Sequence, residues 1–250
     1  MTHTIVIASG KGGTGKTSVT AGVGCALAEL GHSCLMIDAD VGMQSLDMAL
    51  GVHQFAAFDF ADAARGSIAL TDAAVQLADF PLASVLAAPP APDDISVNTL
   101  RTITRNIREL ELYEYVLIDA PAGLGEGFRM AARAADSGLI VATADPICLR
   151  SAERAGQELM ACGVANLRLV VNRVRPALME RGLPNIDDAI DTTGAQLLGY
   201  VPEDEAVIVS GAYGTPSILA PRSRAAQAYR NIAKRLSGEQ VSLLKAGRRG

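Results

Sequence analysis

Residues 10–17 carry the stretch that decides the fold: Gly10, Lys11, Gly12, Gly13, Thr14, Gly15, Lys16, Thr17. It fits the eight-position phosphate-binding pattern G-x-x-x-x-G-K-[ST]. Glycines let consecutive backbone N–H groups turn toward a phosphate without a Cβ in the way. Lys16 places a charge between the β- and γ-phosphates, and Thr17 offers a hydroxyl to Mg²⁺. The stretch therefore predicts binding of a nucleoside triphosphate with Mg²⁺.

The residues on either side of this loop supply the context that the motif requires. Residues 4–8 are apolar enough to form a buried strand, and residues 18–30 are small and apolar, as in a packed helix. A helix that starts near Lys16 points its partial positive charge at the same phosphates. Ser18, in its first turn, joins the predicted nucleotide-binding set.

Further along the chain, apolar runs alternate with segments of helical periodicity. The predicted strands are residues 34–37, 83–87, 115–118, 138–142, 167–171 and 197–201, and the predicted helices are 100–111, 125–135, 150–161 and 222–236. Continuous apolarity within a strand indicates burial on both faces. We therefore expect an α/β fold with a doubly wound, mostly parallel sheet and helices on both faces.

Composition limits the class of protein. With 250 residues, 49% of them hydrophobic and 20% charged, the chain can bury one large core. We expect an ATPase domain over residues 1–237 and a basic tail over residues 238–250. The net charge of −5 gives no general attraction to nucleic acid, so we expect no nucleic-acid partner. The basic residues of the last helix are interpreted as a solvated face: Arg222, Arg224, Arg230, Lys234 and Arg235.

The cysteines and histidines carry no predicted chemistry. The four cysteines lie far apart without metal-ligand spacing: Cys25, Cys34, Cys148 and Cys162. The sequence shows neither a signal peptide nor an apolar run of membrane-spanning length. These observations predict a cytoplasmic protein.

Carboxylates follow two of the predicted strands, where ligands of such sheets bind. Asp38 and Asp40 follow residues 34–37, and Asp119 follows residues 115–118. We predict Thr17 and Asp119 at the metal, while Asp38 and Asp40 can each hold Mg²⁺ or orient the attacking water, and we assign Asp38 to the metal and Asp40 to the water. One alternative stays open for Asp38 or Asp40, the N-cap of the next helix, and a strand-end cap stays open for Asp119.

These features together carry a resemblance. Lys11 within the loop, the Asp38-x-Asp40 pair and the run from Asp119 through Pro121 to Gly123 resemble the deviant Walker A ATPases of the MinD/ParA family, and its MinD type most closely. The likeness covers almost the whole chain. It implies an ATP hydrolase in which two ATP-bound copies associate and Lys11 of each reaches the phosphates of the other. The implied catalytic residues are Lys11, Lys16 and Asp40.

The resemblance also implies a site for the base and a departure from the pattern. Asn172 and Arg173, after residues 167–171, match the family's adenine side, as do the consecutive residues Pro202, Glu203 and Asp204. A strand-end turn for Asn172 and a helix cap at residues 203–204 remain alternatives. Gln44 and Ser45 stand where the family carries arginine and asparagine, so they are left out of the catalytic set.

The function implied by the resemblance is placement of the cell-division site. The resemblance implies three partners: a MinC-like division inhibitor, a MinE- or DivIVA-like positioning factor, and a second copy of the chain in a homodimer. It also implies peripheral binding to the inner face of the cell membrane in the ATP-bound state. The tail, residues 241–250, has two leucines and three basic residues in the sense required for an interfacial helix. A disordered basic tail remains the alternative.

Two other functions stay open at this point. One is a soluble ParA-like partitioning ATPase or a MinD-like regulator of flagellar number. The other is an iron–sulfur carrier, which would need cysteines facing a dimer axis, and Cys148 is the one candidate for that position.

Overall fold

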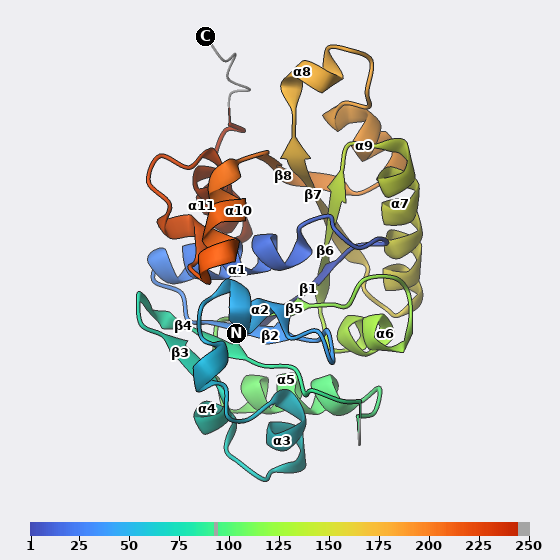
Figure 1. Ribbon diagram of the computed structural model, residues 1–250. Coiled ribbons are helices and arrows are strands. Elements are labelled where there is room, and N and C mark those ends of the chain that lie inside the picture. Colours follow the sequence, from blue (N-terminus) through green and yellow to red (C-terminus); the bar gives the residue numbers. More distant parts are fainter. Residues whose placement is uncertain (93–94, 245–250) are drawn as a thin grey trace.

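The sheet has eight strands, and the computed structural model describes residues 1–92 and 95–244 of the chain (Figure 1). The strands are β1 (His3–Ala8), β2 (Cys34–Asp38), β3 (Val75–Leu77), β4 (Phe80–Leu86), β5 (Tyr115–Asp119), β6 (Ser137–Thr143), β7 (Asn166–Val174) and β8 (Gln196–Pro202). Their order is β3-β4-β2-β5-β1-β6-β7-β8, and every neighbouring pair is parallel except β3 and β4. This confirms the predicted doubly wound, mostly parallel α/β fold.

Helices cover both faces of the sheet (Figure 1). They are α1 (Lys16–Glu29), α2 (Ser45–Ala49), α3 (Phe60–Arg65), α4 (Leu70–Ala73), α5 (Thr99–Glu109), α6 (Glu126–Arg133), α7 (Pro146–Ala161), α8 (Pro176–Met179), α9 (Ile186–Thr193), α10 (Glu205–Tyr213) and α11 (Arg224–Leu236), with short 3₁₀ turns at η1 (His53–Phe55) and η2 (Ser217–Leu219). Helices α1 and α11 pack on one face, while α5, α6 and α7 pack on the other.

Alternate residues of the central strand serve the two cores. Ile5 and Ile7 of β1 are buried in the core under α1 and α11, whereas Val6 and Ala8 are buried in the core under α5, α6 and α7. Burial of both sets explains why the strand is continuously apolar. The helices α1 and α11 approach closely at Gly22, where a Cβ would lie 2.3 Å from the Tyr229 ring.

Register brings the polar strand ends together. Asp38 at the end of β2 lies level with Asp119 at the end of β5, and Asp119 is also paired with Ile7 of β1, just before the glycine-rich loop. The two carboxylates and the loop therefore share one edge of the sheet, as the sequence predicted for parallel strands.

The elements that the sequence did not predict are short. They are the antiparallel edge strand β3 and the helices α2, α3, α4, α8, α9 and α10, which have four to nine residues. Such lengths give too few turns for helical periodicity to emerge. The predicted helix over residues 150–161 starts earlier, at Pro146, where the Asp145 carboxylate accepts a hydrogen bond from the Cys148 amide.

The solvated-face interpretation of the last helix is wrong for two of its arginines. Arg230 binds the Glu29 carboxylate through two nitrogens, 2.6 and 2.8 Å away. Arg235 donates to the Leu198 and Val241 carbonyls. These guanidinium groups hold α11 to α1, to β8 and to the chain that follows. The basic part of the predicted tail, residues 245–250, lies outside the described residues.

Candidate active site

The glycine-rich loop joins β1 to α1 with backbone conformations that only glycine adopts easily. Gly13 and Gly15 have φ angles of 81° and 84°, in the left-handed region. A Cβ on Gly15 would lie 2.3 Å from Nδ2 of Asn172, and one on Gly10 would lie 1.9 Å from the Ser151 carbonyl oxygen. The loop thus requires glycine for its backbone conformation and for its close contact with β7 and α7.

Asp119 is the centre of a buried polar cluster behind this loop. Its carboxylate is fully buried and lies 3.3 Å from Nζ of Lys16. It also accepts hydrogen bonds from the hydroxyls of Thr17, at 2.6 Å, and Thr20, at 3.1 Å. The cluster places an ammonium group, a hydroxyl and a carboxylate together at the start of α1. These are the groups that a Mg²⁺-bound triphosphate requires.

Asp38 organises the segment that follows β2. Its two carboxylate oxygens accept hydrogen bonds from the backbone amides of Asp40 and Leu46, each at 2.9 Å. Burial raises the pKa of Asp38 to about 6, and the nearby charge of Asp119 adds to this, while the two amides oppose it. Asp38 therefore fixes the chain between β2 and α2, and its role as a metal ligand stays a prediction.

Asp40 lies within the electrostatic reach of the same cluster. Partial burial raises its pKa, the Lys16 ammonium lowers it, and the Asp119 carboxylate raises it again. A carboxylate with a raised pKa is better suited to accept a proton from water than an ordinary one. This electrostatic setting agrees with the predicted water-orienting role, which no ligand in the structure tests.

Lys11 behaves differently from Lys16. Its side chain is exposed on the rim of the loop and makes no ion pair within residues 1–92 and 95–244. The backbone of the residue is held, since its carbonyl accepts a hydrogen bond from the Ser9 hydroxyl at 2.9 Å. The loop thus combines a buried lysine aimed inward with an exposed lysine that is available to another molecule.

A cavity of about 110 Å³ lies beside the loop and gathers the predicted base-binding residues. Gly15, Ser18, Asn172, Arg173, Pro202, Glu203 and Asp204 all line it, together with Val207, Ile208 and Tyr229. Nδ2 of the buried Asn172 donates to the Thr14 carbonyl at 2.7 Å. One atom of this amide is thereby committed to the loop, so β7 and the loop are locked together where a base would enter.

Asp204 has a structural role that the sequence left open. Its carboxylate accepts hydrogen bonds from the Ala206 amide, the Ser223 hydroxyl and the Ala225 amide, so it caps α10 and ties it to α11. Burial alone would raise the pKa of Asp204, but these hydrogen bonds outweigh it and lower the pKa. Glu203 pairs with Arg175. The capping alternative is therefore what the structure shows for the Asp204 side chain.

The residues present fit a magnesium nucleotide. The hydroxyl of Thr14 is buried within the loop and has no hydrogen-bond partner in the described part of the chain, as expected where a ligand oxygen belongs. Among the described residues no group of three or more His, Cys, Asp or Glu side chains could hold a metal alone. Magnesium is typically held by one or two side chains plus substrate phosphates, and Thr17 beside Asp119 matches that pattern.

Two residues near the cluster lie outside the predicted set: Thr20, which the sequence interpretation did not name, and Ser45, which it left out. Thr20 donates to Asp119, and the Ser45 hydroxyl lies 3.4 Å from that of Thr17. Thr20 stands four residues after Lys16 and so shares its helix face, which the sequence could have indicated. Ser45 lies near Thr17 because the next residue, Leu46, donates its backbone amide to the Asp38 carboxylate.

Comparison with known proteins assigns this chain to a family. The description "CobQ/CobB/MinD/ParA nucleotide binding domain" matches residues 5–218. The chain belongs to the MinD/ParA family. The septum site-determining protein MinD of Bacillus subtilis is 36% identical over 246 residues, which cover 97% of this chain and 92% of that protein.

Solved members of the MinD/ParA family superpose closely on the chain. The MinC:MinD cell division protein complex of Aquifex aeolicus gives a TM-score of 0.90 at 34% identity, covering 97% of this chain and 98% of that one. MinD of Pyrococcus horikoshii, solved with Mg-ADP, gives 0.84 at 29% identity, covering 94% and 96%. The family consists of ATPases, which agrees with a phosphate loop followed by buried carboxylates.

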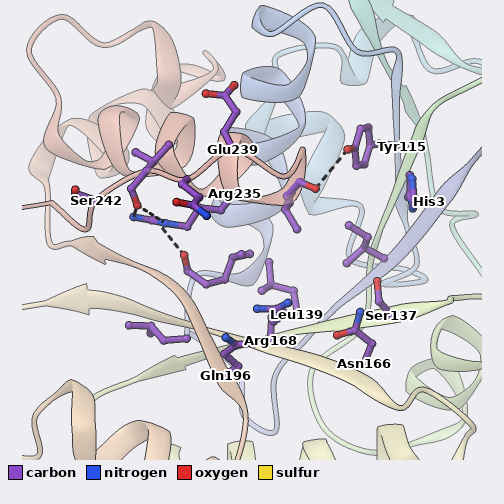
Figure 2. Close-up of a pocket in the computed structure, with 17 residues that line it drawn as sticks. His3, Tyr115, Ser137, Leu139, Asn166, Arg168, Gln196, Arg235, Glu239 and Ser242 are labelled. Carbon is purple, nitrogen blue, oxygen red and sulfur yellow. Dashed lines mark hydrogen bonds between the residues drawn. The ribbon is translucent and has the colours of Figure 1, made fainter.

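A larger cavity of this MinD/ParA fold, about 710 Å³, lies at the opposite edge of the sheet (Figure 2). It is lined by the first residues of β1, β6, β7 and β8 and closed by residues 239–242. Arg235 holds that closing segment through the Val241 carbonyl, and the Tyr115 hydroxyl reaches the Leu236 carbonyl. No helix among the described residues has the length and apolarity to cross a membrane.

Proposed function

We propose that this chain is a MinD-type ATPase that helps to place the cell-division site. It binds ATP with Mg²⁺, pairs with a second copy, and hydrolyses ATP to return to the single chain. The observation that carries the proposal is that one loop holds two lysines in different settings. Lys16 is buried against Asp119, and Lys11 is exposed on the rim. The similarity to MinD proteins supports it.

Within one chain, the loop amides and Lys16 bind the phosphates of ATP. The magnesium ion, when bound, neutralises phosphate charge. Thr17 and Asp119 would hold it, and we propose Asp38 as a further ligand. Asp40 orients the attacking water. Asn172, Arg173 and residues 202–204 form the pocket for the base, where the free carbonyl of the Asn172 amide can accept from an adenine edge.

The second copy completes the site. We assign Lys11 to the phosphates of the partner, where a cation stabilises the charge that develops on the transferring phosphoryl group. Because Lys11 makes no ion pair in its own described chain, no internal contact must be broken for it to reach across. Hydrolysis is then conditional on association.

We place the membrane contact in the tail that follows α11. Leu243 is exposed, whereas the Leu244 carbonyl accepts a hydrogen bond from the Tyr200 hydroxyl on β8, so the body of the protein fixes the point where the tail leaves. Two leucines and a few basic residues bind an anionic bilayer only weakly. Two tails in one dimer raise the affinity through effective concentration, which makes membrane binding dependent on ATP.

For the partner, we propose a MinC-like division inhibitor, with a MinE- or DivIVA-like factor that sets its position. An apolar surface beside the nucleotide pocket suits such a protein. Ile208, which also lines the pocket, is 69% exposed, and Tyr213 and Met48 are 80% and 58% exposed. A contiguous exposed apolar patch, unlike a single exposed side chain, marks an interaction site.

The alternative of a soluble ParA-like partitioning ATPase rests on DNA binding by the last helix. Arg230 and Arg235 are committed to Glu29 and to backbone carbonyls, which removes two of the five basic groups from such a surface. The structure therefore favours the division-site proposal.

The experiment is sedimentation with vesicles of phosphatidylglycerol and phosphatidylcholine in ATP or ADP. We expect the full chain to sediment with ATP, Lys11→Ala to bind ATP but lose sedimentation and hydrolysis, and Leu243→Glu to hydrolyse ATP without sedimenting. Removal of residues 241–250 should act like Leu243→Glu. Sedimentation that persists without the tail contradicts the membrane proposal, and equal loss of ATP binding in Lys11→Ala and Lys16→Ala contradicts the division of roles.

A further inference from the structure

A groove of about 630 Å³ between α5 and α6 carries an unusual charge. Three of its arginines, Arg101, Arg105 and Arg108, come from α5, and Arg133 comes from the end of α6. We refer to it as the arginine groove. Among the residues that the structure describes, Asp136 is the one acidic residue that lines it, in a chain whose net charge is −5.

The arrangement of these arginines opposes local stability. Arg101 and Arg105 are four residues apart, and Arg105 and Arg108 are three apart, so like charges neighbour one another along the helix surface. Such pairs of like charges destabilise a helix slightly. An exposed face that served only solubility would alternate acidic and basic residues. The row therefore indicates a demand other than folding.

The existing ion pairs leave most of this charge unused. Asp136 binds Arg108 at 2.9 Å, and its carboxylate also accepts a hydrogen bond from the Thr4 amide, so this pair fastens the groove to β1. Arg105 lies 3.9 Å from Glu109, and both side chains are about two-thirds exposed. Arg101 and Arg133 form no ion pair with any residue that the structure describes.

We propose that the arginine groove binds a short acidic peptide segment of another protein in an extended conformation. Asn98 and Arg108 mark its ends along α5, about 15 Å apart for ten residues of helix, which matches four or five extended residues. The guanidinium fork binds a carboxylate through two parallel hydrogen bonds. Buried Thr104 and the small Ala134 and Ala135 leave the floor open to a backbone.

Two other polyanions fit this groove less well. A single-stranded nucleic acid binds through aromatic side chains that stack on its bases, and none of the residues lining the groove is aromatic. A bilayer is too flat to enter a concave site. Helix α5 also lies at the opposite end of the molecule from the last described residues of the chain (Figure 1).

The test uses a fluorescein-labelled hexaglutamate peptide and the full chain, with fluorescence anisotropy at low ionic strength. We expect saturable binding that weakens with added salt, because the guanidinium groups are exposed. Replacing both unpaired arginines, Arg101→Gln with Arg133→Gln, should raise Kd about tenfold, since hydrogen bonds to charged groups are the strong ones. The matched control, Arg154→Gln with Arg181→Gln, removes the same charge from exposed positions outside the groove and should change Kd less than twofold.

Circular dichroism and ATP affinity of each variant establish that folding and the nucleotide site are intact. An unchanged Kd in the groove variant, or an equal loss in the control, overturns the proposal. So does displacement of the peptide by a thymidine hexanucleotide at lower concentration than by unlabelled hexaglutamate, which would assign the groove to nucleic acid. Loss of vesicle binding on Arg101→Gln with Arg133→Gln would assign it to the membrane.

Discussion

The two edges of the sheet offer cavities of very different size, and the smaller one has the features of a nucleotide site. At the carboxyl edge, about 110 Å³ lies between the glycine-rich loop and residues 202–204, whereas an open cavity of about 710 Å³ lies at the opposite edge. The small cavity adjoins left-handed glycines, a buried ion pair and an orphaned hydroxyl. The large one is lined by the first residues of the parallel strands and by residues 239–242.

The difference lies in what the arginine and lysine side chains are used for. At the opposite edge, Arg235 donates its hydrogen bonds to backbone carbonyls of β8 and of the segment after α11. It therefore holds the wall of the cavity in place and is not free to bind a ligand. At the carboxyl edge, Lys16 faces a carboxylate that two hydroxyls share. Preorganised polar groups identify a site better than volume does.

The sharpest way to break this comparison is to remove one cation from each edge. Lys16→Ala should lower ATP affinity about 100-fold or more, because hydrogen bonds to charged groups contribute about 1.5–3 kcal/mol and Asp119 is left buried without its cation. Arg168→Ala, in the large cavity, should change it less than about twofold. Titration with a fluorescent ATP analogue measures both. A larger loss of ATP affinity in Arg168→Ala than in Lys16→Ala would show that the nucleotide binds in the large cavity at the opposite edge.

A second pair of variants compares two left-handed glycines. Gly15→Ala adds a Cβ that meets Asn172, so we expect a loss of about 2 kcal/mol in the free energy of unfolding and about tenfold in ATP affinity. Gly31, at φ 91°, has open space around its Cβ position. Gly31→Ala should cost about 1 kcal/mol and leave ATP affinity alone. Urea denaturation and ATP titration distinguish them, and equal ATP affinities would show that the loop tolerates the contact.

The smallest effect concerns the buried carboxyl of Asp38. A pKa raised to about 6 means that the folded chain holds this proton more tightly than the unfolded chain. The resulting stabilisation is complete below the unfolded pKa of about 3.9 and is lost as the pH rises through about 6. Between pH 5 and 7 the loss amounts to about 1 kcal/mol.

Asp38→Asn lacks this ionisation, so the difference in unfolding free energy between variant and parent should shift in favour of the variant by that amount over this range. Urea denaturation in metal-free buffer measures it. A pH-independent difference would mean that Asp38 ionises like an exposed carboxyl.

Local sequence predicted the loop and seven of the eight strands, all but β3, because their signals lie within a few residues. Residues 115–118 are apolar on both faces and end at Asp119, and the structure adds only the register that sets Asp119 level with Asp38. The helices α2 and α10 escaped prediction since they are short and depend on contacts made elsewhere. Asp204 shows this most clearly, because its capping of both α10 and α11 needs Ser223, 19 residues away.

The sequence by itself determined the phosphate loop, the parallel fold and the family resemblance, because glycine positions and apolar runs act through local backbone geometry. Only the tertiary structure decided how the side chains share their partners. It buried Lys16 against Asp119 while leaving Lys11 exposed, turned Arg230 and Arg235 inward, and gathered four arginines from two helices into one groove. Such assignments depend on distances between residues far apart in the chain, which no local pattern records.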